Sequence, residues 1–293
     1  MKSLTLALSL AVACALWIPL AAQPKPVDIY AGVVNDKGEP VTGLTAADFR
    51  VREDGIAREV IKASEATEPL TIALLVDDSQ VSSPALQMIR EAVDAFITAL
   101  SGKAEIALVT FGDRPTIAVD YTTDQKKLLN GAHHLFPRSG SGAYLMDAII
   151  DVSKGLEKRQ PKRPVIAVLT LDDNTEFSNA HYQDVLDHLD ASRAALHVVA
   201  LGTPGSSDSD ENRNRNTVIA MGTERTGGRR DNVLALTGAA PRMKQLADEL
   251  LHQYVVTYAR ADTLIPPQKV EVTVARPELT VRARTRTGQV GAR

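Results

Sequence analysis

Cysteine is almost missing from this chain: Cys14 is the one instance in 293 residues. It lies in an apolar N-terminal stretch that we expect to be removed, so the mature protein would contain no thiol and no disulfide. Histidines in metal-ligand spacing are missing as well. No His-x-x-x-His sequence occurs, and the adjacent His133 and His134 would point about 100° apart on a helix. These absences exclude a disulfide scaffold and argue against a zinc site.

Further absences bear on function. No basic stripe with interleaved aromatic residues occurs, and 36 acidic residues outnumber 33 basic ones, so nothing favours nucleic acid as a partner. No Gly-x-Ser-x-Gly sequence occurs, which removes the signature of an α/β-hydrolase nucleophile. Beyond the N-terminal stretch, the apolar runs are too short for a membrane span. We therefore expect no membrane span in the mature protein, no small-molecule substrate and no enzymatic activity.

The N-terminus has the layout of a secretory signal peptide. A basic residue precedes an apolar region over 4–20, and two alanines follow it. We expect residues 1–22 to be a signal peptide cleaved after Ala22, which predicts an exported protein, periplasmic or extracellular. The alternative is lipidation of Cys14, but residues 11–13 match the required processing sequence poorly.

An apolar run from Ile72 to Val76 ends at Asp77, Asp78 and Ser79. A short continuous run of this kind predicts a central strand of a parallel sheet, covered on both faces. In open α/β sheets, ligands bind outside the carboxyl ends of the strands. The two acids and the hydroxyl therefore mark a candidate site.

Strand and helix signals alternate from residue 67 to residue 252. Further strands are predicted over 105–111, 165–171 and 195–201, and helices over 86–100, 124–135, 143–156 and 241–252. This alternation is typical of an α/β fold with a doubly wound, mostly parallel, Rossmann-like sheet. Residues 203–216 are rich in Gly, Ser, Asp, Asn and Arg, which predicts a mobile surface loop.

The segments on either side of this region have short β patterns. Residues 23–66 form an N-terminal β segment, and residues 253–293 contain three β segments separated by prolines. Neither set buries a core alone, so we expect both to meet in one small β module. The α/β domain over 67–252 would then be inserted between the two halves of that module.

Three arginines, Arg282, Arg284 and Arg286, alternate with small residues in the last β segment. Alternation places their side chains on one face of a strand. A solvated edge that resists aggregation is the usual reason for such a pattern. A partner-binding role for these cations is the alternative.

The flanking segments resemble a known family. Residues 41–49 and 53–55 before the α/β domain, and residues 246–254 and 276–284 after it, resemble the corresponding parts of secreted bacterial von Willebrand factor A proteins. The resemblance covers nearly the whole mature chain. It implies a von Willebrand factor A fold and a role in adhesion or assembly through protein binding.

Family members commonly carry a metal-ion-dependent adhesion site, built from Asp-x-Ser-x-Ser after the first strand, a Thr before a helix and an Asp after a later strand. The resemblance implies that Asp77, Ser79 and Asp172 take three of these positions, while Val81 and Ala143 replace the other two ligands. Mg²⁺ requires oxygen ligands in near-octahedral geometry, which valine and alanine cannot supply. We therefore expect a degenerate site that holds Mg²⁺ weakly or not at all.

Negative charge at this site has to be offset. Asp78 and Asp173 would lie at the same strand ends as Asp77 and Asp172, and like charges at close range repel one another. A cation, an arginine or a helix N-terminus would relieve this repulsion.

The resemblance implies an unidentified protein partner at the C-terminal edge of the sheet. The residues expected to contact it are Asp78, Ser82, Ser139, Ser141 and Asp173. Two alternatives stay open. The chain could be a metal-independent structural component of an envelope assembly, using its β module. It could instead be a magnesium-dependent phosphoryl hydrolase, because acids after central strands can hold magnesium and a phosphate.

Overall fold

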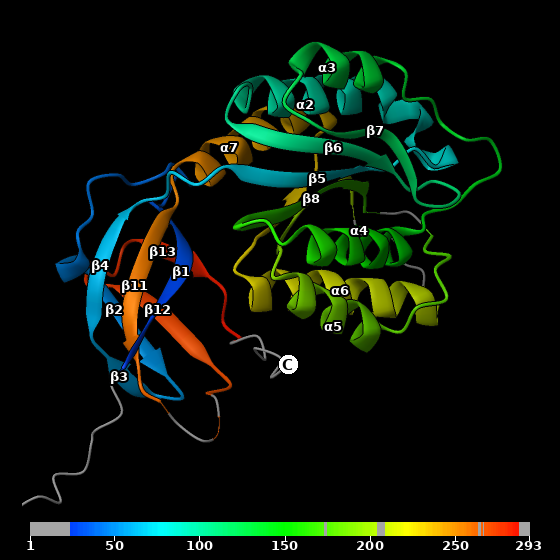
Figure 1. Cartoon of the computed structure of the whole chain (residues 1–293). Helices are drawn as coiled ribbons and strands as arrows, with labels where there is room; N and C mark the ends of the chain where they lie inside the picture. The colour runs from blue at the N-terminus through cyan, green and yellow to red at the C-terminus, as the bar shows by residue number, and fades with distance from the viewer. Residues whose placement is uncertain (1–23, 173–174, 204–208, 263–264, 266, 287–293) are drawn as a thin grey trace, which may run out of the picture.

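The computed structural model describes residues 24–172, 175–203, 209–262, 265 and 267–286. The expected signal peptide over 1–22, with Cys14, and the acid Asp173 lie outside these residues. Within them, the chain forms an α/β domain and a smaller β module beside it (Figure 1).

A six-stranded sheet forms the middle of the α/β domain. Its strand order is β10-β9-β8-β5-β6-β7, and all neighbours are parallel except β6 and β7. The predicted central strand is β5 (Leu70–Val76), which lies between β8 (Arg163–Leu171) and β6 (Ala104–Thr110). The other strands are β7 (Thr116–Thr122), β9 (Ala195–Leu201) and β10 (Arg230–Val233). The predicted doubly wound, mostly parallel sheet is therefore confirmed.

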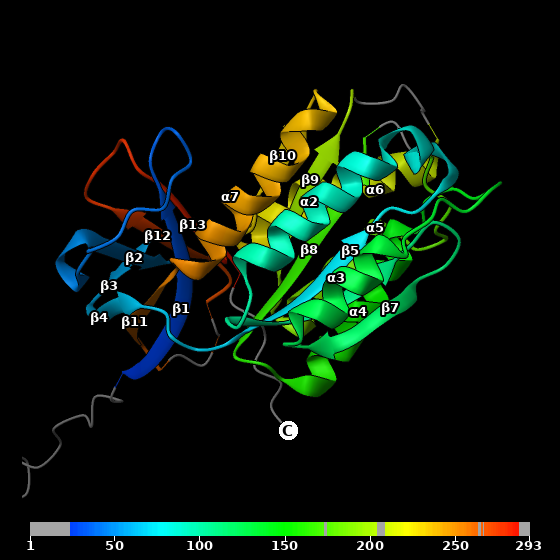
Figure 2. The same cartoon turned by 90° about the horizontal axis from the view of Figure 1, so that it is seen from above.

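Helices cover both faces of this sheet (Figure 2). One face carries α2 (Leu86–Ala99), α3 (Gln125–His133) and α7 (Ala239–Leu251), and the other carries α4 (Leu145–Arg159), α5 (Tyr182–Ser192) and α6 (Asp210–Thr226). Short 3-10 turns are η1 (Ala46–Asp48), η2 (Gln80–Ala85) and η3 (Leu236–Gly238). None of the described helices is both long and apolar enough to cross a membrane.

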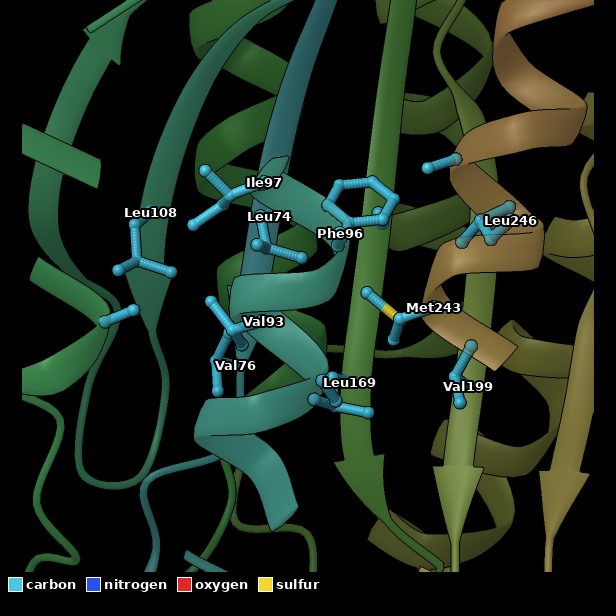
Figure 3. Close-up of a cluster of buried hydrophobic side chains, with 14 of the residues drawn as sticks. Leu74, Val76, Val93, Phe96, Ile97, Leu108, Leu169, Val199, Met243 and Leu246 are labelled. Atoms are coloured by element: carbon cyan, nitrogen blue, oxygen red, sulfur yellow. The ribbon is translucent and has the colours of Figure 1, made fainter. Parts of the chain in front are cut away.

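The side chains of β5 show why its sequence is an unbroken apolar run. Leu74 and Val76 belong to the core that contains α2 and α7, whereas Ala73 and Leu75 belong to the core that contains α4. Figure 3 shows the first of these cores, where Phe96 of α2 lies over the sheet. Alternate residues of a strand point to opposite faces, so a strand covered on both sides needs apolar residues at every position.

The β module combines both ends of the described chain. Its four-stranded sheet has the order β13-β1-β11-β4, and its three-stranded sheet has the order β12-β2-β3. The N-terminal strands are β1 (Lys25–Val34), β2 (Phe49–Glu53), β3 (Ile56–Arg58) and β4 (Val60–Glu65), and the C-terminal ones are β11 (Tyr254–Arg260), β12 (Val270–Val274) and β13 (Thr280–Ala283). Because β1 pairs with β11 and β13, and β2 pairs with β12, the predicted meeting of the two segments is confirmed.

The helix α6 corrects one prediction. A loop was expected over 203–216, but α6 begins at Asp210, and the Ser209 hydroxyl caps it by accepting from the backbone N–H of Asn212 at 3.2 Å. The buried positions of this helix include Asn212 and Arg215, whose side chains form hydrogen bonds inside the protein. Because these buried residues are polar, the segment lacks the apolar periodicity by which a helix is predicted from sequence. Residues 204–208 lie outside the described part of the chain.

Candidate functional site

The ends of β5 and β8 bring Asp77 next to the strand that carries Asp172. Oδ2 of Asp77 accepts from the Thr170 hydroxyl at 3.1 Å and from the backbone N–H of Leu171 at 3.3 Å. Oδ1 accepts from the backbone N–H of Ser79 at 3.0 Å. Protein donors therefore satisfy both oxygens of this buried carboxylate and fasten the two strand ends together.

Asp78 points toward β6 and the loop before α4. Its Oδ1 accepts from the backbone N–H of Gly112 at 2.7 Å, and its Oδ2 accepts from Nε of Arg138 at 2.9 Å. Only glycine fits at position 112, because an added Cβ would lie 2.4 Å from the backbone nitrogen of Ser79. Asp78 is buried in this arrangement, so its carboxylate is not displayed to a partner as the sequence suggested.

Asp172 follows β8 and is also buried. Its Oδ1 accepts from Nη2 of Arg230, the first residue of β10, at 3.4 Å. Its Oδ2 is buried without a hydrogen-bond partner among the described residues. An arginine from a neighbouring strand therefore offsets the charge of Asp172.

A third arginine reaches the strand ends from α6. Nη2 of Arg215 donates to the backbone oxygen of Leu171 at 2.8 Å and lies 3.4 Å from the Thr170 hydroxyl. That hydroxyl in turn donates to Asp77, so hydrogen bonds connect the guanidinium to the acid. Arg215 is 2% exposed. Arg138, Arg215 and Arg230 together supply the positive charge that the clustered acids require.

Glu176 lies at the N-terminal end of α4. Its buried carboxylate accepts from the backbone N–H groups of Leu145 at 3.3 Å, Met146 at 3.5 Å and Ser178 at 3.2 Å. Burial raises the pKa of Glu176 to about 7, although the hydrogen bonds from Ser178 and the charge of Arg215 act in the opposite direction. The carboxylate satisfies N–H groups that have no partner within the helix.

The loop that carries Glu176 is fastened on two sides. The backbone N–H of Glu176 donates to Oδ1 of Asn212 in α6 at 2.8 Å. The backbone N–H of Ala143 donates to the carbonyl of Thr175 at 3.0 Å, and that of Phe177 donates to the carbonyl of Ala143 at 2.8 Å. The loop therefore covers Ala143, which is fully buried.

The residues present do not fit a magnesium site. Val81 and Ala143 place apolar groups where the family resemblance implies direct ligands, and both oxygens of Asp77 already accept from protein groups. In the part of the chain that the structure describes, no group of three or more His, Cys, Asp or Glu could hold a metal ion. Asp77, Ser79 and Asp172 do lie at adjacent strand ends, but they lack the further oxygen donors of an octahedral shell.

The three serines expected to contact a partner differ in exposure. Ser82 is buried, and its hydroxyl donates to the carbonyl of Ser79 at 2.7 Å, so it cannot reach a partner. The Ser141 hydroxyl is half-buried and donates to the carbonyl of Arg138 at 2.8 Å. Ser139 is exposed in the same loop. Of these three serines, Ser139 remains the candidate for a direct contact.

Exposed apolar side chains lie on the three loops that surround the acids. Val81 follows β5, Phe136 lies between α3 and α4, and Phe177 follows β8, with exposures of 44%, 61% and 49%. The loop before α4 contacts both of the others, because the backbone N–H of Gly140 donates to the side-chain oxygen of Gln80 at 2.6 Å and that of Phe177 donates to the carbonyl of Ala143 at 2.8 Å. We call Val81, Phe136 and Phe177 the apolar rim.

Sequence reasoning missed the individual arginines, Glu176 and the apolar rim. The clustering of acids indicated that a counter-charge was needed, but not which arginines provide it. Arg215 lies inside the segment expected to be a loop, and Arg138 reaches Asp78 across 60 residues of sequence. No local pattern marks either contact.

Known proteins match this chain in fold. A family model described as von Willebrand factor type A domain matches residues 72–174. The structure is similar to that of proximal thread matrix protein 1 from the mussel byssus, with a TM-score of 0.51 and 13% identity over 69% of this chain and 50% of that one. No curated protein matches the sequence.

Two further solved structures are similar at lower scores. One is a von Willebrand factor type A protein from Catenulispora acidiphila, with a TM-score of 0.49 and 8% identity over 90% of this chain and 73% of that one. The other is the manganese-loaded TRAP protein of Plasmodium vivax, with a TM-score of 0.48 and 14% identity over 75% of this chain and 95% of that one.

At these identities the likeness concerns the fold, and this chain spans about half the length of the mussel protein. The segment that matches the family model runs from β5 to just beyond β8, so it includes the strand ends that carry Asp77 and Asp172. The α/β part of this chain therefore has the von Willebrand factor type A fold, and domains of this type typically bind proteins.

Proposed function

We propose that this chain is an exported, non-enzymatic protein-binding module whose partner binds at the C-terminal edge of the six-stranded sheet without a divalent metal. One observation carries the proposal: Asp78 and Asp172 are paired with arginines, while the apolar rim around them is exposed. Export is supported by the signal-like sequence of residues 1–22. The partner would be an unidentified protein.

The arginines support metal-independent binding. In the intact family site, a metal ion offsets the acids, and a carboxylate of the partner completes its shell. Here Arg138 lies 2.9 Å from Asp78 and Arg230 lies 3.4 Å from Asp172, so the acids are offset within the chain. The side chains of Arg138 and Arg230 are 35% and 30% exposed, so their guanidinium groups can still donate hydrogen bonds to a partner.

The apolar rim would supply most of the affinity. Phe136 and Phe177 each leave about half of the side chain or more in water, and covering that area would stabilise a complex by about 1 kcal/mol per ring. Both rings are already held: Arg90 lies 5.0 Å above Phe136, and Tyr144 stacks on Phe177 at 6.1 Å. Binding would therefore cost little side-chain entropy.

The surroundings of the acids support a non-enzymatic role. The hydroxyls of Ser82 and Ser141 donate to backbone carbonyls, and the oxygens of Asp77 accept from Ser79, Thr170 and Leu171. No nucleophile with an adjacent base is formed at these strand ends within the described residues. These hydrogen bonds are equally consistent with the alternative function, a structural component of an envelope assembly.

The test is partner capture from the envelope fraction of the source cells in the presence of EDTA. The mature protein is compared with Phe177→Ser and Phe136→Ser at the apolar rim and with Ile61→Ser as a matched control on β4, where Ile61 is 53% exposed. Wild type and the Ile61 variant should capture the same protein, and the two rim variants should lose it.

Two results would contradict the proposal. Capture that is lost with Ile61→Ser but kept with both rim variants would favour a structural component that assembles through its β module. Turnover of phosphoesters by the mature protein with added Mg²⁺ or Mn²⁺, abolished by Asp77→Ala, would identify a phosphoryl hydrolase instead.

A further inference from the structure

A cavity of about 410 Å³ lies at the edge of the sheet opposite the candidate site, where the β module meets the α/β domain. Residues of β1, the starts of β8 and β9, the ends of α5 and α6, and the segment after β13 line it. Its cationic side chains are Lys162, Arg163, Arg193 and Arg284, and its acidic ones are Asp28 and Glu68. The lining therefore carries an excess of two positive charges.

The fold itself uses only some of these cations. Arg163 is buried and donates to the backbone oxygens of Glu68 at 2.8 Å and Leu250 at 2.7 Å. Lys162 and Arg193 are exposed, and neither side chain forms an ion pair or a hydrogen bond within the described residues. Two cations at the cavity are thus available to a ligand.

Positive charge also exceeds negative charge just behind the cavity wall. Asp190 is the shared partner of Arg225 at 2.8 Å, Arg284 at 3.2 Å and Arg286 at 3.6 Å. Burial lowers the pKa of Arg284, and the charges of Arg193 and Arg225 add to this effect while Asp190 opposes it. One carboxylate does not offset three guanidinium groups, so an anion in the cavity would relieve their repulsion.

We propose that this cavity binds a phosphate-bearing anion, with Lys162 and Arg193 as its direct contacts and Arg284, which is paired with Asp190, as a further positive charge in the lining. A phosphate monoester carries close to two negative charges at neutral pH, which matches the excess of positive charge in the lining. Guanidinium groups donate to phosphate oxygens in pairs, and a lysine adds a point charge. The ligand would bind between Arg284, which follows β13 of the β module, and the α4–β8 and α5–β9 loops, and so help to hold the two units together.

The helix ends at the cavity provide a competing explanation for the cations. Gln160, Arg193 and Gly227 are the C-caps of α4, α5 and α6. Cations near a helix C-terminus interact favourably with its dipole, even without a ligand. This explanation predicts that the cations contribute to stability but do not bind phosphate.

The test is calorimetry on the mature chain at constant ionic strength, with inorganic phosphate and pyrophosphate as probes. The variant is Lys162→Ala with Arg193→Asn, because Arg193 has a φ of 60°, which asparagine tolerates better than alanine. The matched control is Lys126→Ala with Lys127→Ala, two exposed lysines of α3. Wild type and control should bind a probe saturably, and the cavity variant should bind it on the order of tenfold more weakly.

A second arm distinguishes a lipid headgroup from a soluble phosphate. It compares vesicles that contain phosphatidic acid with neutral vesicles. Binding in either arm that the cavity variant loses and the control keeps supports the proposal. If no probe binds in either arm, or if wild type and the cavity variant bind equally, the proposal is overturned. A drop in thermal stability of the variant would then identify the cations as helix caps.

Discussion

Glu176 accepts the backbone N–H of Leu145 at 3.3 Å, so a buried carboxylate from the loop after β8 lies at the N-terminal end of α4. This is the helix end where the family resemblance implies a metal-binding threonine, and Ala143 stands there instead. A carboxylate of the chain itself lies at this helix end, and the charge of the nearby Arg215 acts on it. The buried charges that result can be tested by their effects on stability.

The first prediction concerns Glu176 and pH. Because burial raises its pKa from about 4.5 to about 7, the folded state favours the protonated acid. This contribution is fully present below pH 4.5 and is lost as the pH rises through 7. It amounts to about 3 kcal/mol. In Glu176→Gln, the free energy of unfolding, measured with urea at several pH values, should lack this decline.

The exposed Glu157 of α4 provides the control for this prediction. Glu157→Gln should leave the pH dependence of wild type in place. A decline between pH 4.5 and 7 that persists in Glu176→Gln would assign it to another group.

The second prediction concerns His197, which is buried in β9 and has no hydrogen-bond partner for either ring nitrogen among the described residues. Burial lowers its pKa to about 4, and the charges of Arg229 and Arg282 act in the same direction, against Glu249. A depressed pKa contributes stability that is present above pH 6.5 and is lost as the pH falls through 4. His197→Leu should remove about 3 kcal/mol of this acid-induced loss.

The effects of His197 and Glu176 oppose each other over nearly the same pH range. The wild-type stability curve alone therefore cannot separate them, and each variant must be compared with wild type across the whole range. The exposed His134 serves as the control, since His134→Leu should leave the curve unchanged. An unchanged acid limb in His197→Leu would contradict the second prediction.

The sequence allows the strands to be predicted because their signal is local. The run from Ile72 to Val76 has to be a strand covered on both faces, and the structure has it as the central strand. The arginine partners of the acids cannot be predicted in this way, because each arginine belongs to an element that is far from its acid in the sequence. Arg215 is the clearest case: its helix has few apolar residues, and the position of its guanidinium depends on how α6 packs beside β9.

The third prediction concerns Arg215 itself. Arg215→Met keeps much of the side-chain volume but leaves the carbonyl of Leu171 without its charged donor at 2.8 Å. We expect a loss of about 2–3 kcal/mol in the free energy of unfolding. Because Arg215 lowers the pKa of Glu176, its removal should also raise that pKa and shift the pH-dependent decline upward.

Arg213, two residues before Arg215 on the same helix, offers a matched control. Its ion pair with Asp210 is largely exposed, so Arg213→Met should change stability by no more than about 0.5 kcal/mol. Equal losses in the two variants would mean that Arg215 contributes no more than a surface residue.

The fourth prediction concerns divalent cations. Calorimetry of the mature protein with Mg²⁺, Mn²⁺ or Ca²⁺ should give no saturable heat at millimolar concentrations, because the oxygens of Asp77 accept from protein donors and arginines offset Asp78 and Asp172. The matched variant restores two hydroxyls through Val81→Ser and Ala143→Thr. It should gain measurable affinity for Mg²⁺ or Mn²⁺ if missing ligands are the main obstacle, and none if the arginines are. Saturable binding by the wild type that Asp172→Asn abolishes would contradict this prediction and return the metal to the centre of the site.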